Sequence, residues 1–213
     1  MSSPGIVYVV DDEPRMRKAL SRLLRAEAFD VRSFPSGSEF LAAYEPGEIA
    51  CLVLDVTMPE LSGLELQRRL TNAGLLVPIV FLTGDGDIPM SVRAIKSGAV
   101  DFLTKPVNDA DLFRSVRAAL QFAAASSAEH SAHATLAARH LTLTPRECEV
   151  MALVVAGKLN KQIAADLGTG EQTIKIHRGR VMRKMGVESL ADLVRAAEQL
   201  SVRKSHAGSL TKV

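Results

Sequence analysis

Short apolar runs alternate with amphipathic stretches through the first 120 residues, and this alternation restricts the possible folds more than any other feature. The runs cover residues 6–10, 31–34, 49–56, 78–83 and 100–103. Runs of this length that are rich in Val and Ile are typical of strands buried on both faces. Between them lie stretches with apolar residues at helical spacing, such as Met16, Leu20 and Leu24. Strands that alternate with helices predict a parallel α/β sheet with right-handed crossovers.

The second part of the chain is predicted to be all helix. Thr144 and Glu147 have the spacing of a capping box, with Pro145 at the first helical position. Asn160 is expected to cap a second, short helix, and Ser189 to begin a fourth. The predicted division is a domain over 1–122, a linker that is partly helical over 123–139, a domain over 140–201 and a disordered tail over 202–213.

Charge is distributed unevenly along the chain. Residues 1–120 carry 13 Lys and Arg against 16 Asp and Glu, whereas residues 121–213 carry 13 against 8. A basic C-terminal half favours an anionic partner, nucleic acid first and a membrane surface second. No segment approaches the roughly 18 consecutive apolar residues of a membrane span, and the N-terminus does not have the pattern of a signal peptide. Cys51 and Cys148 have no metal-ligand spacing around them, which indicates free thiols and a cytoplasmic location.

Acidic residues follow two of the predicted strands. Asp11 and Asp12 follow the first apolar run, and Asp55 lies near the end of the third. Because the carboxyl ends of parallel strands meet at one edge of a sheet, these carboxylates converge if the two strands are neighbours. Three converging carboxylates repel one another without a cation, and an oxygen-only site suits Mg²⁺. Any one of these residues alone is better explained as a helix cap.

Two further strand ends add groups of complementary chemistry. Thr83 ends the fourth apolar run, and Lys105 follows the fifth. A carboxylate nucleophile with Mg²⁺, an ammonium and a hydroxyl beside it has the groups that phosphoryl transfer requires. Taken alone, Lys105 would be an ordinary solvated lysine at a strand end.

Several motifs then occur in a characteristic order, namely VVDDEP, LDVTMPELSGLEL, FLTGDG and AIKSGAVDFLTKPV. Together they resemble the receiver domain of two-component response regulators, over roughly residues 5–122. The resemblance implies a flavodoxin-like fold with a five-stranded parallel sheet in the order 2-1-3-4-5. It also implies that a sensor histidine kinase supplies the phosphoryl group.

The resemblance assigns a role to each acidic residue. Asp55 would be the phosphoryl acceptor. Mg²⁺ would be held directly by Asp12, Asp55 and the backbone carbonyl of Thr57, with Asp11 contributing through water. Glu60 departs from the pattern, because many receivers have Gly at this position after Met-Pro. This departure adds charge near the phosphorylation loop and removes no catalytic group.

The resemblance also assigns roles at the other strand ends. Lys105 would contact the phosphoryl group, and the bond before Pro106 would be cis. Thr83 and Phe102 would form a switch pair, in which Thr83 turns toward the phosphoryl group and the Phe102 ring moves inward.

The most basic helix of the second part is predicted over residues 171–185. A helical wheel places Ile174, Val181 and Met185 on one face. The opposite face carries Gln172, Lys175, Ile176, Gly179 and Arg183, and the helix holds the further basic residues Arg178, Arg180 and Lys184. Such a face can pair with base edges and touch a thymine methyl in the major groove of DNA. A charged face alone is usually just solvated, but the preceding short helix and tight turn favour a helix-turn-helix.

Residues 141–197 resemble the LuxR-type output domain, nearest to the NarL/FixJ subfamily of response regulators. This resemblance implies that Lys175 and Ile176 meet bases. The other candidate DNA contacts or supports are Lys161, Thr173, His177, Arg178, Arg180 and Arg183. His177 is equally consistent with a packed interior histidine. Gly179 stands where some relatives have a base-contacting lysine, so their operator sequence does not carry over.

The two resemblances together imply a transcription regulator with double-stranded DNA, a sensor histidine kinase and RNA polymerase as partners. Phosphorylation is expected to promote a homodimer through the face formed by residues 88–103, which includes Val92 and Lys96. An alternative dimer surface lies on the last helix around Leu193 and Ala197.

Three other functions fit the sequence less well. A phosphohydrolase of the haloacid-dehalogenase type has a DxD motif after its first strand, where this chain has DDEP, so we predict a regulator and not an enzyme. A DNA-binding protein with a purely structural receiver would not need Asp12, Asp55, Thr83 and Lys105. Binding of the basic helix to a membrane surface is disfavoured because its outer face has no large apolar stripe.

Overall fold

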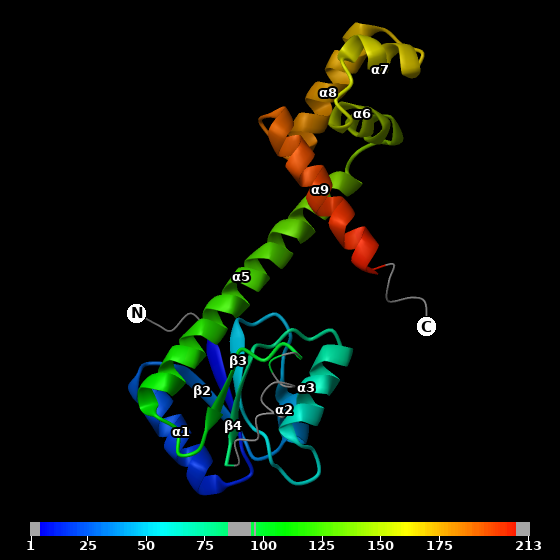
Figure 1. Ribbon diagram of the computed structural model, residues 1–213. Coiled ribbons are helices and arrows are strands. Elements are labelled where there is room, and N and C mark those ends of the chain that lie inside the picture. The colour runs from blue at the N-terminus through cyan, green and yellow to red at the C-terminus, as the bar shows by residue number, and fades with distance from the viewer. Residues whose placement is uncertain (1–4, 85–94, 96, 208–213) are drawn as a thin grey trace. The chain divides into compact units, whose positions relative to one another are not determined.

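The computed structural model describes residues 5–84, 95 and 97–207, and for 202–207 it describes the backbone alone. The chain forms two compact units, Met1–Ala128 and Glu129–Val213. The helix α5 (Asp109–Leu141) begins in the N-terminal unit and ends in the C-terminal unit (Figure 1). Residues 88–94 and 96, which make up half of the predicted dimer face and include Val92 and Lys96, lie outside the described residues.

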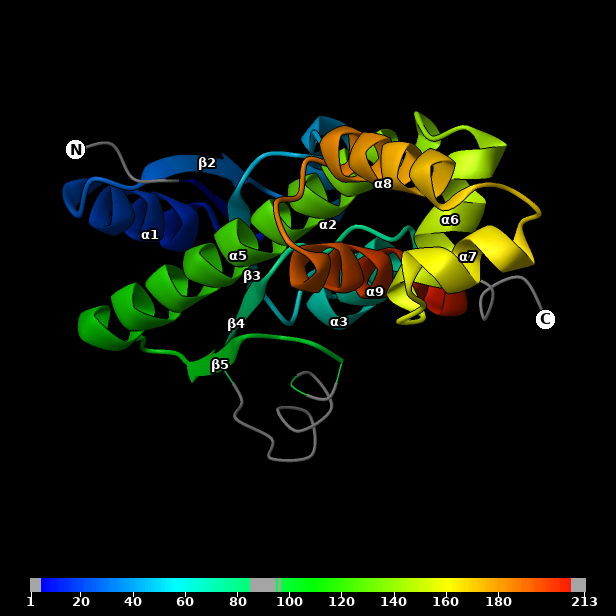
Figure 2. The same ribbon diagram turned by 90° about the horizontal axis from the view of Figure 1, so that it is seen from above.

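The N-terminal unit is built around a parallel sheet. Its strands are β1 (Ile6–Val10), β2 (Asp30–Phe34), β3 (Ala50–Asp55), β4 (Ile79–Thr83) and β5 (Asp101–Thr104). Their order is β2-β1-β3-β4-β5, which confirms the predicted fold class. The helices α1 (Pro14–Ala26) and α5 cover one face, and α2 (Gly37–Ala43) and α3 (Gly63–Asn72) cover the other (Figures 1 and 2).

The two faces of this sheet each have their own hydrophobic core. Val7 and Val9 of β1 pack toward α1 and α5, whereas Tyr8 and Val10 pack toward α2 and α3. Every residue of β3 is buried. This two-sided burial explains why the apolar runs in the sequence are continuous instead of alternating. Each fully buried large aliphatic side chain contributes about 1.5–3 kcal/mol to stability.

Two stretches are more helical than the sequence patterns indicated. The predicted linker, residues 123–139, is entirely part of α5, since its alanines are strong helix formers and it contains neither Pro nor Gly. The last helix, α9 (Leu190–Ala207), continues past the predicted domain end at residue 201 because no helix breaker occurs before Gly208. Within the described part of the chain, no helix is both long enough and apolar enough to cross a membrane.

The C-terminal unit contains α6 (Pro145–Val155), α7 (Asn160–Asp166), α8 (Glu171–Met185) and α9 around one core. The capping box of α6 is confirmed: the Glu147 amide donates to Thr144 Oγ1 (3.3 Å), and the Thr144 amide donates to Glu147 Oε2 (2.9 Å). The prediction for Asn160 was wrong, because it is the first helical residue of α7. Its side-chain oxygen instead accepts a hydrogen bond from Arg178, 3.3 Å away.

The C-terminal end of α8 is tied to its neighbours by two cations. Arg139 of α5 donates to the Met185 carbonyl (3.1 Å), which caps the helix. Gly186 follows with φ 66°, and a Cβ atom there would collide with the Arg139 guanidinium. Lys184 donates to the Thr142 carbonyl (2.8 Å) and to the buried carboxylate of Glu147 (2.6 Å). These bonds hold the end of α8 against α5 and α6.

The Glu147 carboxylate is therefore expected to make the C-terminal unit sensitive to acid. Hydrogen bonds from Lys184 and the Thr144 amide lower the pKa of Glu147 to about 2, from an ordinary value of 4.5. A depressed pKa contributes stability that is present above pH 4.5 and is lost as the pH falls toward 2. Glu147→Gln should lower the free energy of unfolding at pH 7 by about 1–3 kcal/mol, and the deficit should shrink in acid.

Thermal unfolding followed by circular dichroism measures this effect. Both tyrosines, Tyr8 and Tyr44, lie in the N-terminal unit, so tyrosine fluorescence reports that unit separately. Glu149→Gln is the matched control, because this acid is half exposed on the same helix. It should change stability by no more than about 0.5 kcal/mol. Equal effects of the two substitutions, or a Glu147→Gln deficit that does not vary with pH, would contradict the assignment.

Candidate functional site

Three strand ends meet in an acidic site at the carboxyl edge of the sheet. Because β1 and β3 are neighbours, Asp11 and Asp55 lie at the same edge. Lys105, which follows β5, places its Nζ 2.7 Å from Asp11 Oδ2 and 2.7 Å from Asp55 Oδ1. The two carboxylate side chains are only 1% and 7% exposed. The site is therefore a buried pair of carboxylates joined by one ammonium.

Burial and hydrogen bonding act in opposite directions on these groups. Burial raises the pKa of Asp55, and the hydrogen bond from Lys105 counteracts only part of that effect. Burial would lower the pKa of Lys105, yet the hydrogen bonds to Asp11 and Asp55 together raise it. Lys105 therefore remains an ammonium at neutral pH. A carboxylate with a raised pKa is a more basic, and hence a stronger, nucleophile.

The loop after β3 holds Asp55 in place. The Thr57 amide donates to Asp55 Oδ2 (3.1 Å), and the Gly63 amide donates to the Val56 carbonyl (3.0 Å). A Cβ atom on Gly63 would collide with the Asp55 carbonyl oxygen, so the start of α3 approaches β3 this closely only with glycine. Glu60 has φ 63°, in the left-handed region that favours glycine, at a cost on the order of 1 kcal/mol.

Thr83 and Phe102 lie on adjacent strands at this edge. Thr83 is buried at the end of β4, where its carbonyl accepts a hydrogen bond from the Lys105 amide (2.7 Å). Phe102 is half-buried in β5, and its ring centroid lies 6.2 Å from that of Phe81. The peptide bond between Lys105 and Pro106 is cis, as the receiver resemblance implied.

The donor atoms at this edge fit Mg²⁺ in their chemistry. Asp11, Asp12, Asp55 and the Thr57 carbonyl offer only oxygen, and Asp12 is exposed to solvent. Mg²⁺ is usually held by one or two carboxylates and keeps several waters. In the part of the chain that the structure describes, no three His, Cys, Asp or Glu side chains are arranged to enclose a metal ion.

Arg17 also belongs to this site, although its sequence position alone does not point there. Its Nη1 atom donates to the carbonyls of Asp11 (2.8 Å) and Asp12 (3.0 Å). The only sequence signal is its place in the first turn of α1, from which a long side chain reaches back over the preceding loop. Arg17 thus contacts the backbone of both residues that follow β1.

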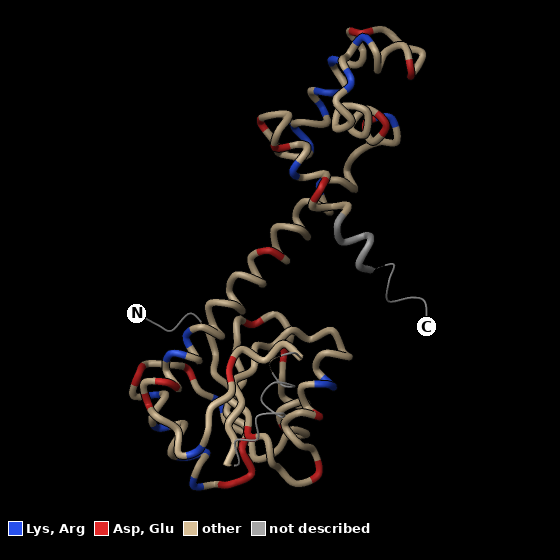
Figure 3. Tube along the Cα trace, viewed as in Figure 1, with Lys and Arg blue, Asp and Glu red and all other residues tan. Residues whose placement is uncertain are grey.

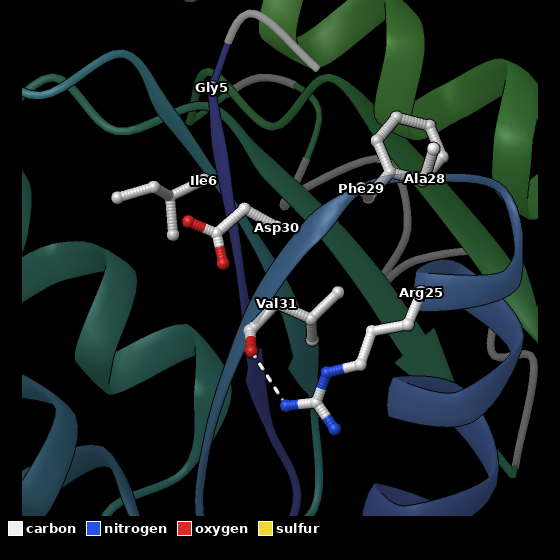
Figure 4. A pocket seen from close by; sticks show the side chains of 7 residues that line it. All are labelled: Gly5, Ile6, Arg25, Ala28, Phe29, Asp30 and Val31. Atoms are coloured by element: carbon white, nitrogen blue, oxygen red, sulfur yellow. Dashed lines mark hydrogen bonds between the residues drawn. The ribbon is translucent and has the colours of Figure 1, made fainter. Parts of the chain in front are cut away.

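A hollow lies at the opposite edge of the sheet, at the amino ends of the strands (Figure 4). Gly5, Ile6, Asp30 and Val31 line it at the start of β1 and β2. Arg25 donates to the Val31 carbonyl there (2.8 Å), which ties α1 to β2. Because none of the candidate site residues lines this hollow, it takes no part in the acidic site.

The helix α8 separates into a buried face and an exposed face. Ile174, Val181 and Met185 are fully buried, which confirms the predicted inner face. The candidate DNA contacts that are exposed are Thr173, Lys175, Ile176, Arg180 and Arg183 on α8 and Lys161 on α7. Ile176 is 49% exposed, although it is a large apolar side chain. Basic residues follow one another along this helix (Figure 3).

The structure divides the basic residues of α8 into two groups. Lys175, Arg180 and Arg183 are exposed, whereas Arg178 bonds to Asn160 and Lys184 bonds to Glu147. Lys184 lies three residues after the buried Val181, which places it near the border of the buried face. The half-buried His177 has a buried Nδ1 atom with no hydrogen-bond partner among the described residues.

Two known protein families match the chain. Residues 7–117 match the response regulator receiver domain, and residues 141–197 match the bacterial regulatory proteins of the luxR family. The first match covers the unit with the acidic site, and the second covers α6, α7 and α8 and the start of α9.

Individual relatives extend over almost the whole chain. Nodulation protein W of Bradyrhizobium diazoefficiens is 46% identical over 96% of this chain and 90% of its own length. The transcriptional regulatory protein FixJ of the same species is 40% identical over 92% of this chain and 96% of its own length. A solved structure of the response regulator StyR has a TM-score of 0.84 and 43% identity, and the match covers 92% of this chain and 100% of that one. The chain therefore belongs to the NarL/FixJ family of two-component response regulators, in which a receiver domain is joined to a LuxR-type helix-turn-helix domain.

Proposed function

We propose that a sensor histidine kinase phosphorylates this regulator on Asp55 and that phosphorylation promotes sequence-specific DNA binding through α8. The observation that carries the proposal is the position of the Lys105 ammonium, 2.7 Å from the Asp55 carboxylate. A buried carboxylate beside a fixed cation has both the nucleophile and the charge that a phosphoryl group requires. The exposed basic face of α8 on the same chain is the proposed DNA-binding surface.

In the proposed reaction, an Asp55 carboxylate oxygen attacks the phosphorus of a phosphohistidine. The new O–P bond forms as the P–N bond breaks, and the imidazole leaves. Mg²⁺ bound by Asp12, Asp55 and the Thr57 carbonyl, with Asp11 acting through water, would neutralise charge on the phosphoryl oxygens. Lys105 would pair with one of these oxygens.

The acyl phosphate would change the charge of the site. Phosphorylation adds about −1.5 to −2 charges at neutral pH. Lys105 shares its ammonium between Asp11 and Asp55, so it can turn to the new anion without losing all of its partners. The Thr83 hydroxyl would donate to another phosphoryl oxygen, and the Phe102 ring would move inward as Thr83 shifts. This switch would alter the surface formed by β5 and the segment before it.

Asp55 should be the only phosphorylated residue, and the reaction should need Mg²⁺. Incubation with a small-molecule phosphodonor should add one phosphoryl group to the wild type and none to Asp55→Asn, measured by intact mass. Asp30→Asn is the control, because this exposed acid lies at the start of β2. A full adduct on Asp55→Asn, or on the wild type in the presence of a chelator, would contradict the proposed chemistry.

For DNA binding, we infer that Lys175 and Ile176 contact bases in the major groove. Their exposure on the face opposite the core supports this role. Lys161, Thr173, Arg180 and Arg183 are the candidates for phosphate contacts. The bond from Arg178 to Asn160 supports a role for Arg178 in holding α7 and α8 together, and the half-burial of His177 is consistent with a packed side chain.

Lys175→Ala should weaken binding to the preferred sequence by about 1–3 kcal/mol and relax the preference at one base position. Arg180→Ala should weaken binding to all sequences alike and reduce the dependence on salt by about one unit of slope. Arg195→Ala is the control, because Arg195 bonds to Asp192 on α9. Fluorescence anisotropy on a set of operator variants at several salt concentrations measures both effects. If Lys175→Ala weakens binding to all operator variants equally, Lys175 contacts a phosphate and not a base.

We also infer that phosphorylation promotes a two-fold dimer through residues 88–103. A two-fold dimer presents two copies of α8 to half-sites about one DNA turn apart, and it raises the effective concentration of the second domain. RNA polymerase is the expected partner of the DNA-bound form. Leu193 is completely buried in the core, which argues against the alternative dimer surface around this residue.

Val92→Asp should accept phosphate as the wild type does and fail to dimerise, because it places a charge in an apolar contact. Light scattering with and without phosphodonor measures the mass. Ala197→Asp on α9 serves as the comparison, since Ala197 is half-buried there. Dimerisation of phosphorylated Val92→Asp at the wild-type level would show that another surface is responsible.

A further inference from the structure

We propose that Arg17 is a positioning residue for Mg²⁺ binding: it fixes the loop after β1 so that Asp12 can reach the ion without further ordering of the backbone. This inference rests on the proposed function, since it concerns the same acidic site. Arg17 itself contacts neither the ion nor the phosphoryl group in this role. It acts only through the backbone of Asp11 and Asp12.

The hydrogen bonds of Arg17 identify the loop as its target. One guanidinium nitrogen, Nη1, donates to the carbonyls of both Asp11 (2.8 Å) and Asp12 (3.0 Å). The backbone amide of Arg17 donates a hydrogen bond to the Glu13 carbonyl (3.0 Å) at the start of α1. The base of the side chain is thus fixed in the helix while its end holds the preceding loop.

The position of Arg17 in its helix is electrostatically unfavourable for a cation. It lies at the N-terminal end of α1, where the helix dipole disfavours positive charge. The side chain is nevertheless half-buried instead of extending into solvent. Its two bonds to carbonyl oxygens are charge-assisted, which makes them stronger than bonds between neutral groups. The bonds to the loop outweigh the unfavourable position.

Asp11 and Asp12 depend on these bonds to different degrees. The Asp11 carboxylate is also held by Lys105 (2.7 Å) and by the Glu13 amide (2.8 Å). Asp12 is exposed, and the bond from Arg17 to its carbonyl restrains the backbone that carries its carboxylate. The N-cap residue of α1, Glu13, makes no side-chain capping bond that would hold the loop instead. Asp12 therefore gains most from Arg17.

Two opposite effects of Arg17 on Mg²⁺ can be separated. Its positive charge repels a divalent cation, so an effect of charge alone predicts tighter binding when the charge is removed. Its hydrogen bonds order the loop in advance, so positioning predicts weaker binding when they are lost. The entropy of fixing one residue corresponds to about a 5- to 30-fold change in affinity. Arg17→Lys keeps the charge but cannot reproduce the geometry of the guanidinium.

The test measures Mg²⁺ affinity directly, by isothermal titration calorimetry on the full chain without phosphodonor. We expect Arg17→Lys and Arg17→Gln both to raise the Kd for Mg²⁺ by about 5- to 30-fold. Their melting temperatures in the absence of Mg²⁺ show whether they are folded. Arg22→Lys and Arg22→Gln are the matched controls on the exposed side of the same helix, and both should bind Mg²⁺ as the wild type does.

Phosphorylation provides the second measurement. At saturating Mg²⁺ both Arg17 variants should reach the wild-type rate, and only the Mg²⁺ concentration for half the maximal rate should rise. Wild-type affinity for Mg²⁺ in Arg17→Lys, or tighter binding in Arg17→Gln, would overturn the proposal. If Arg17→Gln does not fold, the Mg²⁺ affinity of Arg17→Lys alone tests the proposal. If the wild type is phosphorylated on Asp55 while the Arg17 variants bind Mg²⁺ normally, the positioning role fails and the proposed function stands.

Discussion

The ion pair between Lys105 and the two carboxylates of Asp11 and Asp55 is the interaction on which the N-terminal unit's site depends. Two carboxylates this deeply buried repel each other, and their desolvation is costly unless a cation lies between them. Lys105 comes from a strand end 94 residues away from Asp11 in sequence. The site therefore requires β1, β3, β4 and β5 to be paired in their correct register.

The C-terminal unit also contains a lysine paired with a buried carboxylate, but there the pair anchors a helix. Lys184 pairs with the buried Glu147, and Arg139 caps the carbonyl of Met185, so the end of α8 is fixed to the domain. The exposed half of the helix carries Lys175 and Ile176. Because a rigid helix presents its side chains at fixed positions, anchoring one end sets the direction of the other. Basic residues in one helix thus serve two roles, anchoring and binding.

Much of the architecture was predictable from local patterns. The five apolar runs correspond to the five strands within one or two residues, because burial on both faces of a sheet leaves a continuous apolar signal. Their order came from the resemblance to receiver domains, not from periodicity. The helical state of residues 123–139 was less clear, because an Ala-rich stretch has high helix propensity but few apolar anchors. The cap of α7 was misassigned by one residue.

Motif order and apolar spacing are local properties, and they were enough to predict the family, the strand and helix pattern, and the residue types at the strand ends. The pairing of charges, in contrast, emerged only from the folded arrangement. That arrangement assigned Lys105 to both carboxylates, Lys184 to Glu147 and Arg17 to the backbone of Asp11 and Asp12. The physical reason is that a charged side chain looks the same in sequence whether it meets water or a buried partner. That distinction arises only when distant segments pack and exclude water from between them.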